Sequence, residues 1–375
     1  MAKLFVCGDI TNMSGSNNFI DDKLTDIIKK SDYAIGNLEG PEIGPSEKAQ
    51  YPHQSSGTIK YLKDVGFNML LLANNHITEQ GAVGLATTMN LIDETGMDRI
   101  GAGLSWEEAY KPLIRKIDGV SFGFVNICEA QDGYYKEKTQ QYGFAWMGYD
   151  GLFDNISSLS TKVDKVVVFV HTGLEHYPIP LPEVRSFYRH ICDAGASVVI
   201  GGHTHSPQGY EFYGDKFIAY SLGNFFFPRT DGSWKEENRS YSLCLDFKQN
   251  GKAIVTPVFH TLNGDEVELC YNTNNTIDIR SLCAQLSDDY LTKADDMCID
   301  AYKCKYSKIL AMATCGESYN TDILSVMKNI LRTTLLRKKY VKSTLKLRTG
   351  QMLMCFQNET RRSTITRALN KLSKN

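Results

Sequence analysis

The sequence predicts an α/β (α+β) protein, specifically a four-layer αββα sandwich followed by a helical extension. Through the first 210 residues, short apolar runs alternate with polar turns and helical segments, and strands then dominate to about residue 262. That order of elements fits two stacked sheets with helices on their outer faces. From about Ile277 the periodicity is helical only. We therefore place one domain over residues 1–265 and the extension over residues 275–375.

The first hundred residues contain three candidate strands and three candidate helices, separated by polar or glycine-containing turns. They are strands at 3–7, 33–36 and 69–73 and helices at 21–30, 58–65 and 81–95. Gly66 and Gly96 follow the second and third helices. Glycine commonly ends a helix there because it adopts a positive φ without strain. These glycines and polar turns separate the predicted elements, and the predicted order of elements depends on them.

The next part of the domain begins with a hairpin. Asp118-Gly119 separates apolar runs at 114–117 and 121–126, which is typical of a two-residue hairpin turn. The Tyr-rich segment 131–150 has no clear period, and we expect either a packed surface loop or a flap over the substrate. The remaining elements are helices at 153–162 and 181–194 and strands at 165–170, 196–200, 217–220, 240–247 and 253–262.

The composition is that of a soluble globular protein. Of 375 residues, 42% are hydrophobic and 22% are charged. No stretch approaches the about 18–20 apolar residues that a membrane span needs, and we find no signal peptide. The ten cysteines are scattered without CxxC spacing, so we expect reduced, mostly buried thiols. We therefore predict a cytoplasmic protein, which leaves room for peripheral attachment to a membrane.

The C-terminal tail has a charge of its own. Residues 328–374 contain thirteen Lys or Arg against one acid, whereas the preceding residues carry 28 basic and 42 acidic side chains. The segment 322–331 has near-helical apolar spacing and leads into the basic run 337–342. Such a tail fits an anionic membrane surface or an acidic protein partner. The alternative is a solvated face on helices that pack against the acidic domain. We expect no nucleic-acid partner.

The stretch Gly201-Gly202-His203-Thr204-His205 follows the buried strand at 196–200. Two glycines allow a sharp turn there. In an extended segment the spacing of His203 and His205 points both imidazoles to one side, so both can converge on a metal ion. The alternative is a polar loop whose histidines are satisfied by backbone groups.

Five predicted strands end at a potential metal ligand. The ligand candidates are Asp9, Glu39, Asn75 with His76, His171, and His203 with His205. If the strands are parallel neighbours, their carboxyl ends form one rim and these side chains face one cleft. Oxygen and imidazole ligands together favour Mn²⁺, Fe²⁺ or Zn²⁺ over an all-oxygen Ca²⁺ or Mg²⁺ cage. The pattern therefore predicts a divalent metal site.

Seven motifs, in order from about residue 3 to 228 and more weakly to 262, resemble the CapA family of capsule and poly-γ-glutamate synthesis proteins. They are Gly8-Asp9, Ile35-Gly36-Asn37-Leu38-Glu39-Gly40-Pro41, Leu72-Ala73-Asn74-Asn75-His76, Gly101-Ala102-Gly103, Val170-His171-Thr172-Gly173-Leu174-Glu175-His176-Tyr177, the double-glycine stretch at 201–205, and Tyr220-Ser221-Leu222-Gly223-Asn224-Phe225. CapA proteins are in turn similar to calcineurin-like metallophosphoesterases. The resemblance implies a metallophosphatase-like sandwich with metal at the strand ends.

The resemblance also implies roles for single residues. Asp9 corresponds to the first metal-binding aspartate, Glu39 to a bridging carboxylate and Asn75 to the asparagine ligand. His76 matches the histidine that assists the leaving group. His171 and His203 would complete one metal site, and His205 would serve the other.

Two departures weaken one of the two sites. A phosphoesterase has a histidine two residues after the first aspartate, and Thr11 stands at that position. Its second motif is usually Gly-Asp, and here it is Gly36-Asn37. With one imidazole lost and one carboxylate displaced, we expect one firm metal site and at most a second, weaker one.

The chemistry that follows is hydrolysis by a metal-activated water at an amide, ester or phosphoester, with His76 or Glu175 as general acid or base. Epimerisation of a peptide, in which one of these groups removes an α-proton, is an alternative, as is a non-catalytic subunit that binds polymer. We assign substrate binding to Asn37, His176 and Asn224. The alternative to these roles for Glu175 and His176 is that the two side chains pair with each other and form a wall of the cleft.

Members of the CapA family in poly-γ-glutamate systems are usually exported and tethered to the membrane. We find neither a signal peptide nor a membrane anchor in this sequence. We therefore expect a cytoplasmic relative that acts on a polymer or peptide in a capsule or related biosynthetic pathway. The leading hypothesis is a metal-dependent hydrolase of the CapA type.

Overall fold

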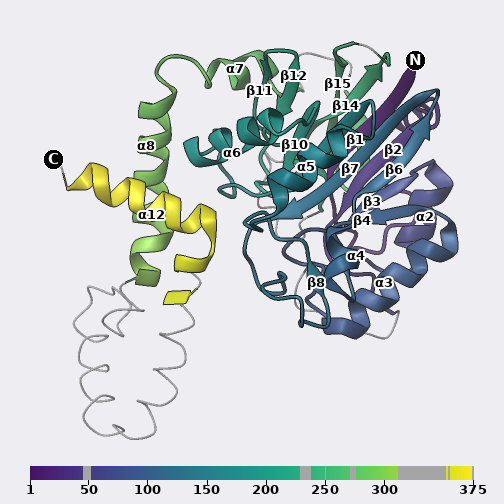
Figure 1. The fold of residues 1–375 in the computed structure, drawn as a ribbon, viewed down its shortest axis with the longest axis horizontal. Coiled ribbons are helices and arrows are strands. Elements are labelled where there is room, and N and C mark those ends of the chain that lie inside the picture. The colour runs from purple at the N-terminus through teal and green to yellow at the C-terminus, as the bar shows by residue number, and fades with distance from the viewer. Residues whose placement is uncertain are drawn as a thin grey trace, which may run out of the picture. The chain divides into compact units, whose positions relative to one another are not determined.

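A computed structural model describes residues 1–44, 52–228, 238–249, 251–270, 276–310, 352–353 and 355–373 of the chain. The chain divides into two compact units, Met1–Asp288 and Asp289–Asn375. The first unit contains two large β-sheets with their helices, and the second contains helices (Figure 1).

The first sheet is parallel in one half and antiparallel in the other. Its order is β16 (Glu266–Leu269), β15 (Ile254–Asn263), β14 (Arg239–Phe247), β1 (Ala2–Ile10), β2 (Tyr33–Leu38), β3 (Met69–Leu71) and β4 (Asp98–Ile100). Strands β1 to β4 run parallel to one another. A further short strand, β13 (Asn224–Phe226), pairs in parallel with the carboxyl end of β1 and places Asn224 opposite Asp9.

The second sheet has a parallel centre flanked by two antiparallel edges. Its order is β11 (Tyr210–Tyr213), β12 (Lys216–Ala219), β10 (Val198–Gly202), β9 (Lys165–His171), β7 (Val120–Cys128) and β6 (Leu113–Ile117). Strands β12, β10, β9 and β7 are parallel. A separate two-stranded ribbon joins β5 (Ala102–Gly103) to β8 (Gly143–Phe144).

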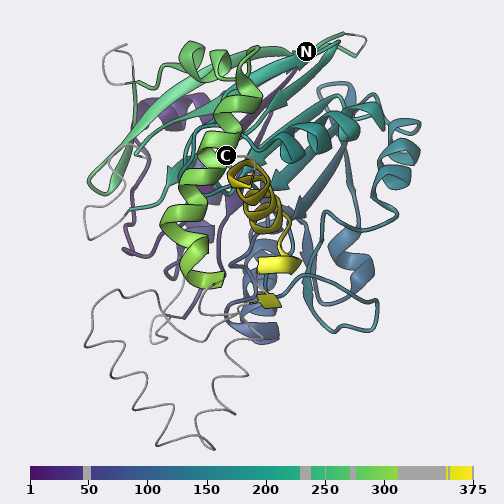
Figure 2. The same cartoon turned by 90° about the vertical axis from the view of Figure 1, so that its left-hand side faces the viewer.

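The strands carry apolar residues on both faces, so each sheet packs against the other sheet on one face and against helices on the opposite face. On β1, Leu4 and Val6 belong to the inner core with residues of the second sheet such as Phe169, whereas Phe5 and Cys7 face an outer core. The outer core is closed by α1 (Asp22–Lys29), α2 (Thr58–Val65) and α3 (Gly81–Thr95). On the other sheet, β9 and β10 are covered by α5 (Leu152–Ser160) and α6 (Pro182–Asp193). These are the four layers of the predicted αββα sandwich (Figure 2).

Local signals define several elements as predicted. Helices α2 and α3 end at Gly66 and Gly96, which have φ values of 115° and 72°. The hairpin of β6 and β7 turns at Asp118 and Gly119, both with positive φ. The structure also contains elements that were not predicted, including β4, β16 and α4 (Trp106–Tyr110). Helix α7 (Ile279–Ala284) falls in the stretch predicted to be helical, and both it and β16 lie beyond residue 265 and within the first compact unit.

The second unit contains α8 (Tyr290–Ala301), the π-helix η2 (Tyr302–Tyr306) and α12 (Glu359–Leu372). Helices α8 and α12 pack together, and Arg367 on α12 donates to Asp295 on α8 at 2.8 Å. The predicted amphipathic segment 322–331 and the basic run 337–342 lie outside the described residues. Across the described ranges, every helix is too short or too polar to cross a bilayer.

Candidate metal centre

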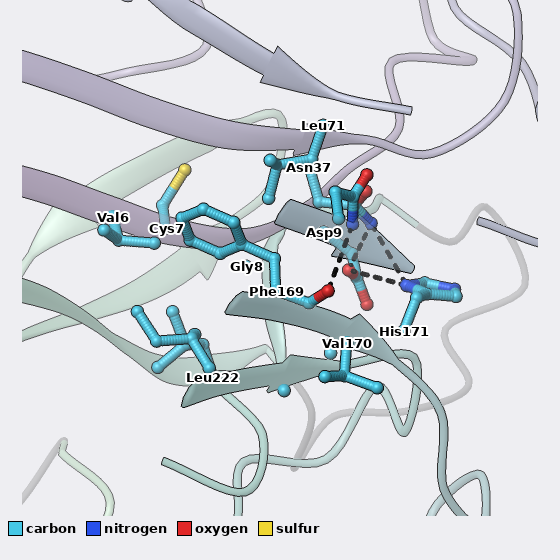
Figure 3. Close-up of a pocket in the computed structure, with 14 residues that line it drawn as sticks. Val6, Cys7, Gly8, Asp9, Asn37, Leu71, Phe169, Val170, His171 and Leu222 are labelled. Atoms are coloured by element: carbon cyan, nitrogen blue, oxygen red, sulfur yellow. Dashed lines mark hydrogen bonds and ion pairs between the residues drawn. The ribbon is translucent and has the colours of Figure 1, made fainter. Parts of the chain in front are cut away.

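The carboxyl ends of parallel strands from both sheets meet at one place. Asp9 lies on β1 and Glu39 directly after β2 in the first sheet, whereas His171 ends β9 and His203 follows β10 in the second. Figure 3 shows Asp9 and Asn37 from the first sheet facing His171 from the second. The strands are therefore not all neighbours, which was the condition under which we expected a single rim. Two sheet edges face each other, and the candidate ligands lie between them.

Four ligand atoms converge on one point at this meeting of the sheets. His171 Nε2 lies 2.9 Å from Asn75 Oδ1, 3.1 Å from His203 Nδ1 and 3.8 Å from Glu39 Oε1. Ligand atoms of Glu39, His171 and His203 all lie within 4.8 Å of one another. Each of the four atoms is an acceptor oxygen or a ring nitrogen that can present a lone pair, so a cation would satisfy them together. These are the residues that the sequence analysis assigned to the firmer site.

A second group shares Glu39 with the first. Ligand atoms of Asp9, Glu39 and His205 also lie within 4.8 Å of one another, and His205 Nδ1 is 3.9 Å from Asp9 Oδ2. Asn224 Oδ1 lies 2.9 Å from the same His205 nitrogen. The group therefore has two carboxylates but a single imidazole. It carries fewer nitrogen ligands than the first group.

The two departures from the family pattern have visible structural roles. Thr11 is buried, and its hydroxyl donates to the backbone carbonyl of Glu39 at 3.2 Å, so it steadies a ligand without supplying one. Asn37 donates to Asp9 Oδ1 at 2.7 Å and lies 3.3 Å from His171 Nδ1. Its amide therefore orients candidate ligands from both sheets.

The histidine-rich turns have an unusual backbone. His176, His203 and His205 have φ values of 69°, 84° and 58°, and they are three of the four non-glycine residues with positive φ in the described chain. The assumption of an extended segment at 201–205 is therefore wrong, and the chain turns instead. The turn brings the His203 N–H to 3.2 Å from Asp9 Oδ2. Such conformations cost about 1–3 kcal/mol each and are concentrated at functional sites.

The floor beneath the ligands is apolar. A small cavity between the sheets is lined by Val6, Leu71, Phe169 and other apolar side chains, with Asp9 and His171 at its edge (Figure 3). Apolar surroundings disfavour the charged form of every ionisable group. The ligand candidates are therefore desolvated at the point where both sheets meet.

This desolvation shifts the pKa values of the site towards neutral forms. Burial raises the pKa of Asp9 to about 6, although the hydrogen bond from Asn37 opposes this. Burial and the charge of Asp9 raise the pKa of Glu39 well above its usual value. Burial lowers the pKa of His171, as does the neighbouring His203, and it lowers the pKa of His205 to about 3. The imidazoles of His171 and His205 are thus neutral at physiological pH, which is the form that binds metal.

His76 lies at the edge of the ligand cluster with a carboxylate behind it. Its Nδ1 is 3.1 Å from Glu79 Oε1, and its Nε2 is 3.8 Å from Glu39 Oε1. The His76 side chain is 18% exposed, so solvent or substrate can reach it. Glu79 was not among the predicted site residues, although it follows His76 by three positions.

Glu175 and His176 both lie beside histidines of the cluster. Glu175 Oε1 lies 3.9 Å from His203 Nε2, and the Glu175 side chain is 28% exposed. The His176 ring stacks on that of His205, with ring centroids 5.7 Å apart, and its N–H donates to the Thr204 carbonyl at 2.8 Å. Both residues therefore lie beside the two histidines that follow β10.

Glu129 is a further acidic residue at the site that the sequence analysis did not identify. It follows β7 directly, is 1% exposed, and places Oε1 3.6 Å from His203 Nε2. The sequence held a signal for it, since a carboxylate comes just after the predicted strand at 121–126. The predicted strand ended at Asn126, two residues before the observed end of β7 at Cys128, so Glu129 was not recognised as the residue that follows the strand.

The model of the family described as "Bacterial capsule synthesis protein PGA_cap" matches residues 3–229. The capsule biosynthesis protein CapA of Bacillus anthracis is 30% identical over 261 residues, which cover 67% of this chain and 62% of that protein. The PGA biosynthesis protein CapA of Bacillus subtilis is 29% identical and covers 66% of this chain and 67% of that protein. The chain thus spans about two thirds or less of the length of these relatives.

Among solved structures, a hypothetical protein from Thermus thermophilus matches with a TM-score of 0.46 and 15% identity, covering 70% of this chain and all of that one. A 5'-nucleotidase precursor from the same organism matches with a TM-score of 0.41 and 15% identity, covering 78% of this chain and 59% of that one.

Proposed function

The chain belongs to the PGA_cap family of bacterial capsule synthesis proteins, and from this we propose that it is a metal-dependent hydrolase of surface-polymer biosynthesis. Its reaction would be cleavage of an amide or ester linkage in the polymer or in a precursor. The names of the Bacillus relatives, one of them a PGA biosynthesis protein, support a glutamate polymer as the substrate class.

The observation that carries the proposal is the state of Glu39. Both carboxylate oxygens of this residue are fully buried and have no hydrogen-bond partner among the residues that the structure describes, whereas imidazole nitrogens of His76 and His171 lie 3.8 Å away. A buried, unpaired carboxylate is costly unless a cation compensates it. The donor set around Glu39 combines carboxylate, amide oxygen and neutral imidazole, which suits Mn²⁺, Fe²⁺ or Zn²⁺. The residues therefore fit a divalent metal.

Two groups of side chains would hold the metal. The firmer site would use Glu39, Asn75, His171 and His203, and a second site would use Asp9, Glu39 and His205. A bound divalent ion supplies a water of lowered pKa and polarises the scissile carbonyl.

The protein's own groups would manage protons at the mouth of the site. Glu79 faces His76 Nδ1 and would keep a proton there, which leaves Nε2 turned towards the ligand cluster. From that position His76 can take a proton from the attacking water or return one to the leaving group. Glu175 is the other candidate, because it is partly exposed and lies beside His203.

Measurement of bound metal tests the proposal. Purified protein should contain Mn, Fe or Zn, and added metal should raise its melting temperature. Glu39→Gln and His203→Ala should each abolish that rise, whereas Glu94→Gln, which changes an exposed carboxylate on α3, should leave it intact. Absence of both bound metal and thermal stabilisation in the wild type would favour a non-catalytic polymer-binding subunit.

The substrate class needs a separate assay. Oligomers of γ-linked glutamate should be shortened by the metal-loaded wild type and left intact by His203→Ala. Turnover of a generic aryl phosphate, lost in His203→Ala, would instead assign a phosphoesterase.

We also propose that the protein works in the cytoplasm. The nine cysteines in the described part of the chain are free thiols, several of them buried, which suits a reducing compartment. Fractionation of the native host with an antibody against the protein tests this location.

A further inference from the structure

We propose that Glu129 is a positioning residue, which holds a proton on His203 Nε2 and thereby turns the lone pair of His203 Nδ1 towards the metal site. The inference rests on the proposed metal-dependent function. It concerns a carboxylate outside both groups of candidate ligands.

The backbone places Glu129 beside the ligand cluster. Strand β7 pairs in parallel with β9, so Cys128 lies opposite His171, and the Glu129 N–H donates to the His171 carbonyl at 3.1 Å. The side chain is then 1% exposed, at the same sheet edge as His171 and His203. Its position is thus determined by the register of the sheet.

Neighbouring donors fix the orientation of the Glu129 carboxylate. Oε2 accepts from the Thr172 hydroxyl at 2.6 Å, and Oε1 accepts from the Gln131 amide at 3.0 Å. The Gly173 N–H is 3.5 Å from Oε2. Oε1 therefore remains directed at His203 Nε2 across 3.6 Å, slightly longer than a hydrogen bond, and a small rotation of the ring would close this gap.

The two nitrogens of His203 have different surroundings. Nδ1 lies 3.1 Å from His171 Nε2, on the side of the candidate ligands, and Nε2 faces Glu129 and Glu175. A neutral imidazole carries one proton, and an acceptor next to one nitrogen leaves the other free to bind metal. Glu129 is the stronger of the two acceptors because it is buried, whereas Glu175 is partly hydrated and screened.

The direct test is the tautomer of His203 in metal-free protein, read from long-range ¹H–¹⁵N NMR spectra of the imidazole. The wild type should carry its proton on Nε2. Glu129→Gln should shift the population towards the Nδ1–H form, and Thr172→Val should do so partly, because it removes the 2.6 Å donor at similar volume. Glu175→Gln is the matched control and should keep the wild-type tautomer. An unchanged tautomer in both Glu129→Gln and Thr172→Val would overturn the inference.

Metal affinity supplies the second readout. Loss of such a partner typically weakens metal binding by about 10–100-fold, so we expect that loss for Mn²⁺ in Glu129→Gln by calorimetry and a smaller loss in Thr172→Val. An altered tautomer with unchanged Mn²⁺ affinity would contradict a role towards metal. If the wild type binds none of Mn²⁺, Fe²⁺ and Zn²⁺, the proposed function fails, and the tautomer still decides whether Glu129 holds His203.

Discussion

At the scale of single residues, burial disfavours the charged forms of the candidate metal ligands. Without metal, burial holds Asp9 and Glu39 closer to their protonated forms and keeps His171 and His205 neutral. A divalent ion favours the deprotonated carboxylates, so its binding must displace protons from them. The imidazoles of His171 and His205 add little to this competition at neutral pH, because burial lowers the pKa of both, that of His205 to about 3.

The pH dependence of metal affinity should therefore follow the carboxylates. We expect Mn²⁺ affinity to fall as the pH is lowered through about 6, the pKa of Asp9, by roughly tenfold per pH unit for each proton displaced. Calorimetry in buffers of different ionisation enthalpy measures both the affinity and the protons released. Asp9→Asn should bind more weakly, with a shallower pH dependence. A midpoint that persists unchanged in Asp9→Asn would assign the effect to another group of the site, Glu39 or an imidazole.

At the scale of an element, β10 depends for close packing on Gly201, its second-to-last residue. A Cβ on Gly201 would lie 1.9 Å from the Tyr220 carbonyl oxygen and 2.6 Å from the Tyr188 hydroxyl. Gly201 does not have a positive φ, so the requirement is one of space and not of conformation. The next turn carries His203 and His205, and any shift of β10 moves both ligands.

Gly201→Ala should therefore impair both stability and metal binding. Backbone and side-chain displacement of this kind costs about 1–3 kcal/mol or more, which urea unfolding can measure. Gly251→Ala is the matched control, because a Cβ there meets only Lys248 at 3.7 Å. Equal unfolding free energies for the wild type and Gly201→Ala would contradict the close approach of β10 to Tyr220.

Elements defined by local signals could be predicted from the sequence, and their assembly could not. The apolar runs before Asp9, Glu39 and His171 predicted strands that the structure contains, and the carboxyl ends of these strands predicted the candidate site. The division of those strands between two sheets depends on contacts between distant residues, which periodicity does not contain. The left-handed backbone of His203 is likewise imposed by tertiary contacts, since the residue itself does not favour it. Glu129 was missed because β7 extends to Cys128.

At the scale of the whole chain, the first unit closes its core with segments that lie beyond the sequence-predicted domain end at residue 265. Val267 on β16 is fully buried, its N–H donates to Phe19, and its carbonyl accepts from Asp21. Helix α7 packs on β11, where a Cβ on Gly209 would meet the Leu282 carbonyl at 2.6 Å. Both core clusters of the sandwich consist of residues from this unit.

Two truncations separate these boundaries. A chain of residues 1–288 retains every candidate ligand, β16 and α7, so it should unfold cooperatively and gain stability from Mn²⁺ as the full chain does. A chain of residues 1–265 should lose several kcal/mol of stability or fail to fold, because it uncovers β15 and removes the buried Val267. Circular dichroism melts with and without Mn²⁺ measure both. Equal melting temperatures for the two truncations would place the end of the folding unit at residue 265, and a 1–288 chain that fails to fold would show that the first unit needs residues 289–375.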